Sequence, residues 1–596
     1  MDDKNMDDKT MDENVRGDKA IYQQLCTNIF LIANEKIDFK SLEKNLICGD
    51  PQIKEWQNIP LPQAKIHIKA ALQERGYNHI RIIEKNEQLV IYVGSLTKVT
   101  DILINGFSYD HSLWPYHNLI GRILTPSLLD EIQSHLQQQL WREGIPCAQY
   151  KVIADADTGI IMIKIENAKK LKILSVKNET PILKMNLKVM ARYYAFHIGE
   201  IFNSNYMELT MKRMVTDGIV QNARYTVECD GSNNLKNENK LKNENNKNEG
   251  VVIKHHFVVG KSRLITAGVG TSNEQYFILR LSWKNVRLGP HGSSAEVVAL
   301  ASSTEQRLNI SSNWYPSISF PKFYIRPNLE LVGEREEYYR TISQYLKLEL
   351  GSSLDTSKIN WHFNIGPVFN HQVTYRGIGP KESTFLTTNA FIELISHDFE
   401  YYRTSPRSGL LLNFFTIGAQ KQLLSSISAY RFSLTGEYLY NVYNLNPPIL
   451  ILGLRGKAST SFIPELANQK QEIPLLFRHF LGGVDDLRGF DRKQLPRDPE
   501  GALSSLYGGW EARFPLLFYD KLQPLIFIDS GWLSKKSFKL DSTIYWSPGA
   551  GFRFESPFGT FRGVVAYGQV SHGNENEEEK AYFRKVKYYL SYGQEF

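Results

Sequence analysis

The sequence predicts three small N-terminal α+β modules followed by a sixteen-stranded antiparallel transmembrane β-barrel. No apolar run approaches the roughly 20 residues that a spanning helix needs, and the longest, at residues 447–454, has the length of a strand. Near residue 262 the pattern changes from mixed helix and strand periodicity to short strands separated by turns. A closed barrel is the other structure that satisfies every backbone N–H and C=O group in lipid, so such a chain would cross a membrane with strands.

Composition narrows the functional classes. The chain has 596 residues and a net charge of +7, and its basic residues are spread along the sequence instead of forming one block, which argues against nucleic-acid binding. The sequence contains no GxSxG, HExxH or P-loop motif, so no enzymatic activity is expected. No CxxC pair or cysteine–histidine spacing indicates a metal site, and no cofactor is expected.

The four cysteines are Cys26, Cys48, Cys147 and Cys229, all in the N-terminal part of the chain. Buried, reduced cysteines that act as small apolar side chains are the favoured expectation, and one or two disulfides in an oxidising compartment are the alternative. A secretory signal is not visible at the N-terminus, where only residues 29–33 are continuously apolar. The sequence therefore leaves open either a different start or another export route.

The N-terminal part divides into a polar tail and three modules. Residues 1–20 repeat the letters MDDK and are expected to be disordered. The modules are expected at residues 21–95, 96–168 and 169–261, each with a helix followed by a strand hairpin. Their helices are predicted at residues 61–75, 126–143 (with Ser127 as N-cap), 185–194 and 206–215. A low-complexity run at residues 233–248 is expected to be a disordered insertion in the third module.

The barrel is expected over residues 262–596. Many of its segments alternate apolar and polar residues, as in Phe277, Leu279, Leu281 and Trp283, and this pattern suits a wall between lipid and a wet lumen. A soluble β-sandwich would show the same period. Sixteen strands are predicted to begin near residues 264, 275, 295, 306, 323, 341, 358, 386, 408, 424, 448, 505, 522, 546, 560 and 583.

Aromatic residues and the C-terminus favour the barrel over the sandwich. Aromatic residues make up 12% of the chain, and many lie at predicted strand ends, where interfacial girdles form. The chain also ends on a strand in which Tyr588, Leu590, Tyr592 and Phe596 share one face, a pattern expected of a C-terminal strand signal.

One connection is unusually long. About 46 residues, 459–504, separate the eleventh and twelfth predicted strands, and a loop of this length usually has a function. It contains FLGGVDDLRGFDR at residues 480–492, in which Gly482 and Gly483 permit sharp turns and Arg488 lies on a compact tip. Downstream follow YGGWEARFPL (507–516), FIDSG (527–531) and FESPFGTFRGVV (554–565).

These four segments, in this order, resemble the C-terminal barrel signature of the outer-membrane insertase superfamily that contains BamA, TamA and the two-partner secretion transporters. The resemblance implies POTRA modules before the barrel, in the periplasm, and a location in the bacterial outer membrane. Three such modules before sixteen strands are most similar to TamA, a translocation and assembly module subunit. The family motif [VI]RG[FY] corresponds to Leu487, Arg488, Gly489 and Phe490, so leucine replaces the usual valine or isoleucine.

The resemblance implies that this loop folds into the barrel lumen and that Arg488 contacts Asp529. Glu511 is a second candidate acidic partner. Physical chemistry supports such a pair, because a guanidinium inside a lumen needs a planar acceptor and a carboxylate provides one. The alternative is that Arg488 is a solvated loop arginine and that Glu511 is an ordinary lumen-facing carboxylate.

A further expectation is a weak seam between the first and last barrel strands, joining residues 264–270 with 588–596. Gly268, Gly270 and Gly593 would weaken it, although structural turns or bulges explain these glycines equally well, and an opened edge could template an incoming strand. The resemblance implies assembly or translocation of unfolded outer-membrane or autotransporter clients, with outer-membrane lipid and a TamB-like inner-membrane protein as partners. A two-partner secretion transporter, a lipid-transfer barrel and a passive porin are the alternatives.

Overall fold

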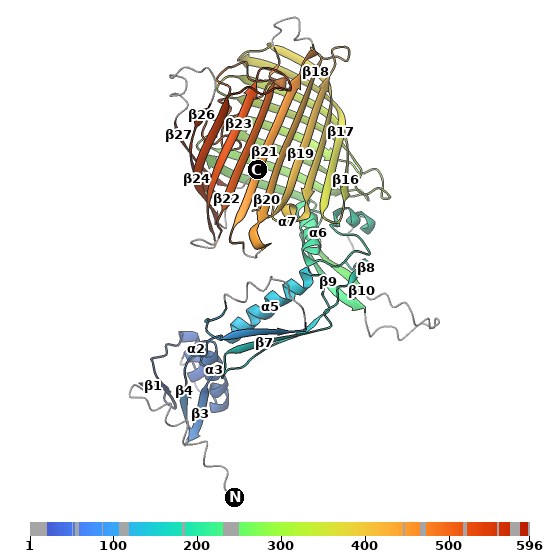
Figure 1. Cartoon of the computed structure of the whole chain (residues 1–596). Coiled ribbons are helices and arrows are strands. Elements are labelled where there is room, and N and C mark those ends of the chain that lie inside the picture. The colour runs from blue at the N-terminus through green and yellow to red at the C-terminus, as the bar shows by residue number, and fades with distance from the viewer. Residues whose placement is uncertain are drawn as a thin grey trace, which may run out of the picture. The chain divides into compact units, whose positions relative to one another are not determined.

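The computed structural model describes residues 21–593, apart from residues 51, 54–58, 86, 107–118, 181–184, 231–249, 404, 445–447, 465–472, 516–520, 557–558 and 572–584. The expected disordered segments, residues 1–20 and 233–248, lie outside the described residues. Three small α+β modules precede one closed antiparallel barrel, as the sequence predicts (Figure 1). No helix in the described ranges is long and apolar enough to cross a membrane.

The first module is a four-stranded sheet, in the order β1-β2-β4-β3, covered by two helices. Helix α3 packs Ala64, Ile68 and Leu72 on the sheet residues Leu31 and Ile91, because residues four apart share one helix face. The sequence prediction identified α3, β3 and β4 but missed the other three elements. The elements are β1 (Ile21–Cys26), β2 (Ile29–Ala33), α2 (Ser41–Cys48), α3 (Leu61–Gln73), β3 (Ile80–Lys85) and β4 (Gln88–Val93).

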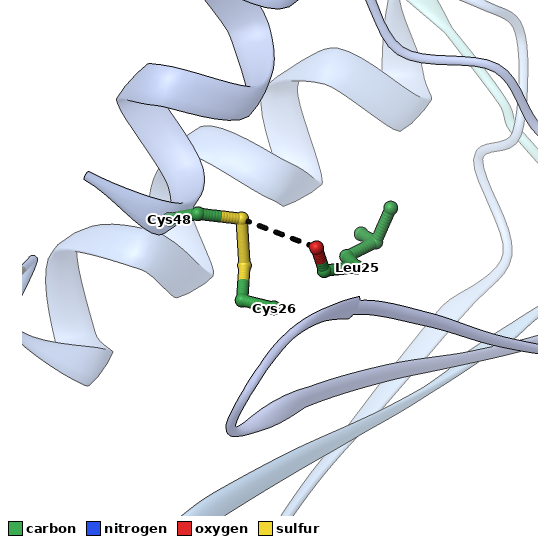
Figure 2. The surroundings of a disulfide bond; sticks show 3 residues. All are labelled: Leu25, Cys26 and Cys48. Atoms are coloured by element: carbon green, nitrogen blue, oxygen red, sulfur yellow. Dashed lines mark hydrogen bonds between the residues drawn. A yellow bond between two sulfur atoms is a disulfide. The ribbon is translucent and has the colours of Figure 1, made fainter. Parts of the chain in front are cut away.

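The favoured prediction of reduced cysteines is wrong. Cys26 at the end of β1 forms a disulfide with Cys48 at the end of α2, and their Cα atoms are 5.7 Å apart (Figure 2). Cys147 and Cys229 are disulfide-bonded as well. Pairing could not be read from the sequence, because it depends on which strand end and helix end the fold brings together. Disulfides are typical of oxidising compartments such as the periplasm.

The second module has a three-stranded sheet, β5-β7-β6, and one described helix. Helix α5 buries Leu128, Ile132, Leu136 and Leu140 in a single stripe against this sheet. Its N-cap is Thr125, whose hydroxyl accepts from the backbone N–H of Leu128, and not Ser127 as predicted. Pro126 occupies the first helical position, so the cap is the residue before it. The elements are β5 (Asp101–Asn105), α5 (Pro126–Arg142), β6 (Gln149–Ala154) and β7 (Ile160–Glu166).

The third module repeats this arrangement and packs with the barrel as one compact unit. Its sheet order is β8-β10-β9, with β8 parallel and β9 antiparallel to the central strand. Val286 of the barrel belongs to the same hydrophobic core as Val189 and Met214 of the module. The elements are β8 (Lys172–Asn178), the 3-10 helix η2 (Leu187–Tyr193), α6 (Ser204–Thr216), β9 (Asn222–Asp230) and β10 (Gly250–Val258).

The barrel has sixteen antiparallel strands, because β25 and β26 are two halves of one strand interrupted at Gly568. Each predicted strand start lies within about five residues of the observed one. The strands are β11 (Arg263–Ser272), β12 (Ile278–Leu288), β13 (Ser293–Ser302), β14 (Glu305–Asn313), β15 (Tyr324–Arg335), β16 (Arg340–Asp355), β17 (Ile359–Arg376), β18 (Glu382–Ser396), β19 (Gly409–Ala419), β20 (Ala429–Asn441), β21 (Ile451–Phe462), β22 (Ser504–Arg513), β23 (Leu522–Ser534), β24 (Ile544–Ser556), β25 (Gly559–Tyr567), β26 (Gln569–Ser571) and β27 (Val586–Gly593).

The two faces of the barrel wall differ in chemistry. The predicted stripe on β12, with Leu279, Leu281 and Trp283, points outward and is exposed in the isolated chain. Inward positions are polar and buried, for example Asn328 and Glu330 on β15. An apolar outer surface around a polar interior is the pattern of a barrel in lipid, so the soluble sandwich is excluded.

Candidate functional site

The connection between β21 and β22 folds back against the inner wall of the barrel. On β23, the exposed outward residues Ile526 and Ile528 alternate with the buried residues Phe527 and Asp529, which therefore face the lumen. Residues 480–492, here called the lumen hairpin, contact these inward side chains. The hairpin thus occupies the interior of the barrel.

Arg488 is the charged centre of the hairpin. Its side chain is only 5% exposed and forms a bidentate pair with Asp529, with Nε–Oδ2 and Nη2–Oδ1 distances of 2.8 and 2.9 Å. The third nitrogen, Nη1, donates to Oε2 of Glu511 at 2.7 Å. The structure therefore brings Arg488 to both candidate carboxylates at once, and places none of the three in solvent. The guanidinium also lies 3.3 Å from the ring centroid of Phe527, a cation–π arrangement.

The carboxylates that receive Arg488 have further partners. Asp529 is fully buried and accepts from the Tyr507 hydroxyl at 3.1 Å. Glu511 accepts from Nε of Arg513 at 2.6 Å through its other oxygen. Because buried charges are costly unless paired and hydrogen-bonded, this network fixes the hairpin to β22 and β23. Two arginines and two carboxylates make it neutral overall.

Glycines and one aspartate shape the hairpin. Gly482 and Gly483 have φ angles of +117° and +111°, which L side chains rarely adopt. Asp486 accepts from the backbone N–H groups of Gly482 and Leu487 and closes the turn. A Cβ on Gly489 would lie 2.5 Å from Cβ of Ser547 and 2.6 Å from Cα of Gly568, so the tip can approach the wall only as glycine.

Two apolar residues of the motif anchor the tip. Leu487 and Phe490 are buried in a cluster with Tyr507 and Leu533 of the wall. The Phe490 ring packs edge-on against Tyr545, with centroids 5.9 Å apart. The leucine at position 487 therefore fills the place of the usual β-branched residue with full burial.

The hairpin also contacts both sides of the first-to-last strand seam. On β27, the Tyr589 hydroxyl donates to the carbonyl of Phe490 at 2.5 Å, and Lys587 pairs with Asp491 at 2.6 Å. On the other side, Glu274 in the β11–β12 turn accepts from the backbone N–H of Val484 at 3.2 Å.

The seam itself is short. Among the described residues, β11 and β27 pair only at Thr271–Tyr592 and Ser272–Ser591, whereas β11 and β12 share eight pairs. The sequence predicts that residues 264–270 join residues 588–596; the described pairs use Ser591 and Tyr592 of the second segment, with Thr271 and Ser272 directly after the first. Residues 594–596 of the predicted seam lie outside the described ranges.

Asn273 extends the seam with its side chain. Its Nδ2 donates to the carbonyl of Tyr588 at 2.6 Å, and its Oδ1 accepts from the backbone N–H of Leu590 at 3.2 Å. The side-chain amide of Asn273 thus forms hydrogen bonds with backbone groups of β27 that face β11.

The C-terminal strand residues face outward. Tyr588, Leu590 and Tyr592 are 63%, 47% and 38% exposed, and so form an apolar stripe on the outer surface. Phe596, the fourth member of the predicted signal, lies outside the described residues.

A second set of contacts joins the third module to the barrel. Arg192 of η2 donates to the carbonyls of His291, Gly292 and Pro321, and its guanidinium lies 3.3 Å from the centroid of the Tyr315 ring. Arg287 of the barrel donates in return to the module carbonyls of Ile219 and Gly260.

An ionic network completes this docking. Arg213 of α6 forms a bidentate pair with Glu400 of α7 (His397–Tyr401), at 2.7 and 2.6 Å, and contacts Asp355 at 3.0 Å (Figure 1 shows α6 and α7 at the same end of the barrel). Asp355 also receives Lys322 at 2.7 Å and His397 at 3.2 Å.

A cavity of about 830 Å³ lies where the third module meets the barrel. Its lining combines cationic, anionic and aromatic side chains from both parts, including Arg213, Asp217, Tyr315, Lys322 and Glu400. In the described ranges, no group of three or more His, Cys, Asp or Glu residues could hold a metal ion.

The sequence analysis did not identify several residues that take part in these contacts. Tyr507 and Arg513 share the inward parity of Glu511 on one strand, and Phe527 shares that of Asp529, so strand periodicity could have identified them. No sequence signal identifies Arg192, Asn273, Glu274 or Lys587, because their roles depend on segments distant in the chain.

The sixteen-stranded barrel with an apolar outer face, a hairpin in its lumen and preceding α+β modules defines an outer-membrane β-barrel protein with a periplasmic arm. Its residues 329–596 match the family model described as the Omp85 superfamily domain.

Comparison with individual proteins gives three further findings. The outer membrane protein assembly factor BamA of Nitratidesulfovibrio vulgaris is 29% identical over 129 residues, which are 20% of this chain and only 16% of that protein. The BamA structure from Haemophilus ducreyi lacking POTRA domains 1–3 covers 84% of this chain and 100% of its own, at 12% identity and a TM-score of 0.47. CdiB from Acinetobacter baumannii covers 84% and 90%, at 12% identity and a TM-score of 0.43.

Proposed function

We propose that this protein assembles or translocates unfolded outer-membrane clients, of the β-barrel or autotransporter type, through lateral opening of the β11–β27 seam. The observation that carries the proposal is the shortness of this seam. Among the described residues, β11 and β27 share two residue pairs, whereas β11 shares eight pairs with β12 and β27 shares eight with β25. Strand edges with free N–H and C=O groups template an added strand. An opened seam would offer two such edges at the membrane.

The lumen hairpin supports this role over that of a passive porin. The buried Arg488 network fills part of the lumen, and a pore for free diffusion would need neither this plug nor three periplasmic modules. Its contacts to Glu274, Lys587 and Tyr589 place the hairpin next to both seam strands, so a client entering the lumen would meet the hairpin and the seam together. No catalytic role is proposed.

Within the superfamily, three modules before a sixteen-stranded barrel favour a TamA-like function with a TamB-like inner-membrane partner. A two-partner secretion transporter and a lipid-transfer barrel are the alternatives. These three functions can be separated by depleting the protein and surveying the outer membrane. A TamA-like function predicts loss of particular barrel or autotransporter proteins. A two-partner transporter predicts loss of one secreted partner, and a lipid-transfer barrel predicts a change in lipids.

Seam opening has a direct test. Ser272 and Ser591 are register partners across the seam, so a disulfide between cysteines introduced in S272C/S591C should hold the strands together. In cells that depend on the variant, client levels should fall by at least about ten-fold under oxidising conditions, while each single variant supports normal levels.

The matched control is S459C/S505C, which joins register partners on β21 and β22 that stay paired in any open state. If the locked seam and the locked control support equal client assembly, lateral opening is not part of the function.

A further inference from the structure

Among the described residues, the sheet of the first module has four strands, whereas those of the other two modules have three. In all three sheets one central strand, β4, β7 or β10, pairs parallel with one neighbour (β2, β5 or β8) and antiparallel with the other (β3, β6 or β9). Strands β5 and β8 lie at the edges of their sheets among the described residues. In the first module that edge belongs to β2, and β1 covers it.

Strand β1 pairs antiparallel with β2 over the whole of β2, from Ile21–Ala33 to Cys26–Ile29. Its apolar side chains are only partly covered: Ile21 and Tyr22 are 41% and 62% exposed, Tyr22 stacks on Phe30, and Leu25 is partly buried against the module core. Gln23 adds two side-chain hydrogen bonds, accepting from the backbone N–H of Ile37 and donating to its carbonyl.

The Cys26–Cys48 disulfide fixes the end of this strand to α2 (Figure 2). Cys48 Sγ also lies 3.7 Å from the carbonyl oxygen of Leu25. Both cysteines are only partly buried, so a dithiol can approach them. A weakly packed edge strand held by one covalent link should be released when that link is broken.

We propose that β1 is a resident edge strand, held by the Cys26–Cys48 disulfide, which excludes extended polypeptides from the β2 edge until the disulfide is reduced. Reduction by a dithiol breaks the S–S bond and gives two thiols, and the reductant becomes a disulfide. The freed β2 edge then accepts an extended peptide as an antiparallel strand, since strand addition uses backbone groups that any sequence carries. The ligand class is an unfolded polypeptide, and the proposal stands independently of which client the barrel serves.

The test compares the full chain in detergent with its C26S/C48S variant by hydrogen exchange and mass spectrometry. Serine substitution is preferred to chemical reduction, because Cys147 and Cys229 are disulfide-bonded too and a reductant would open them. We expect amides of β1 and those of β2 that face it to exchange at least ten-fold faster in the variant. Helix α3 and the opposite edge strand β3 should be unchanged.

Two exchange results would overturn the proposal. Unchanged exchange in β1 and β2 would show that the strand stays in place without the disulfide. Faster exchange in α3 as well would show that the disulfide supports the module core and not an edge strand alone.

Peptide binding tests the vacated edge. The probe is a labelled synthetic peptide of residues 20–27 with serine in place of Cys26, and a scrambled peptide is the control. It should bind C26S/C48S/Q23P, in which β1 also loses the Gln23 contacts, at least ten-fold more tightly than it binds the native protein. Equal binding to both, or equal binding of the scrambled peptide, would refute a strand-addition site at β2.

Discussion

Replacing Arg488 by alanine is expected to lower the free energy of unfolding of the barrel by about 3 to 5 kcal/mol and to detach the lumen hairpin. The substitution leaves Asp529 and Glu511 buried without the guanidinium that serves both, and an unpaired buried charge costs more than the pair contributes. Thermal or urea unfolding in detergent measures the stability, and protease protection of residues 480–492 measures the position of the hairpin. Client assembly should fall with hairpin protection.

Arg488→Lys separates charge from geometry. Lysine keeps the positive charge but cannot form the bidentate pair with Asp529 while reaching Glu511, so the loss should be intermediate. Asp529→Asn should resemble Arg488→Ala. Arg497→Ala is the matched control, because this arginine belongs to the same connection but is exposed. Full hairpin protection and full assembly in Arg488→Ala would refute the proposed role of the pair.

The barrel could be predicted from the sequence because its physics is local and repetitive. An alternation of apolar and polar residues, as in Leu279, Leu281 and Trp283, is imposed separately on every strand by lipid on one side and water on the other. Turn residues then mark the strand ends. These two signals need no knowledge of which strands lie together, and the fold class was confirmed.

The first module shows where local signals fail. Strand β1 is too exposed to carry an alternating apolar pattern, and α2 has only eight residues, so neither rises above the background of the sequence. The cysteines that join them were predicted to be reduced, since sequence spacing says nothing of which elements a fold brings within 5.7 Å.

Some residues of the candidate site could likewise be predicted from local sequence signals, and others could not. The RGF tip, Asp529 and Glu511 lie in recognisable motifs, and inward parity on β22 and β23 would have added Tyr507 and Phe527. The seam contacts could not be predicted, because Glu274 and Val484 are 210 residues apart and Lys587 and Asp491 are 96 apart. Such pairs depend on closure of the barrel, which only the complete set of strands determines.

Docking of the third module leads to a second large effect. Replacing Arg213 by alanine is expected to destabilise the attachment of α6 to the barrel by about 3 to 5 kcal/mol, because its side chain is only 11% exposed and pairs with the buried carboxylate of Asp355 and the largely buried carboxylate of Glu400. Hydrogen exchange of α6 amides in the full chain measures the effect. Exchange should rise by about two to three and a half orders of magnitude, since about 1.4 kcal/mol corresponds to ten-fold.

The control for this variant is Lys188→Ala, which removes an exposed cation from η2 of the same module and should leave α6 unchanged. Barrel strands β16 and β18 should keep their protection in both variants, because their hydrogen bonds lie within the wall. If α6 exchange in Arg213→Ala equals that in the control, the module is held by Arg192 and the shared apolar core alone. If α6 amides exchange faster in Arg213→Ala than in the control, the ionic network around Arg213 holds this module on the barrel, and its loss opens the cavity next to α6.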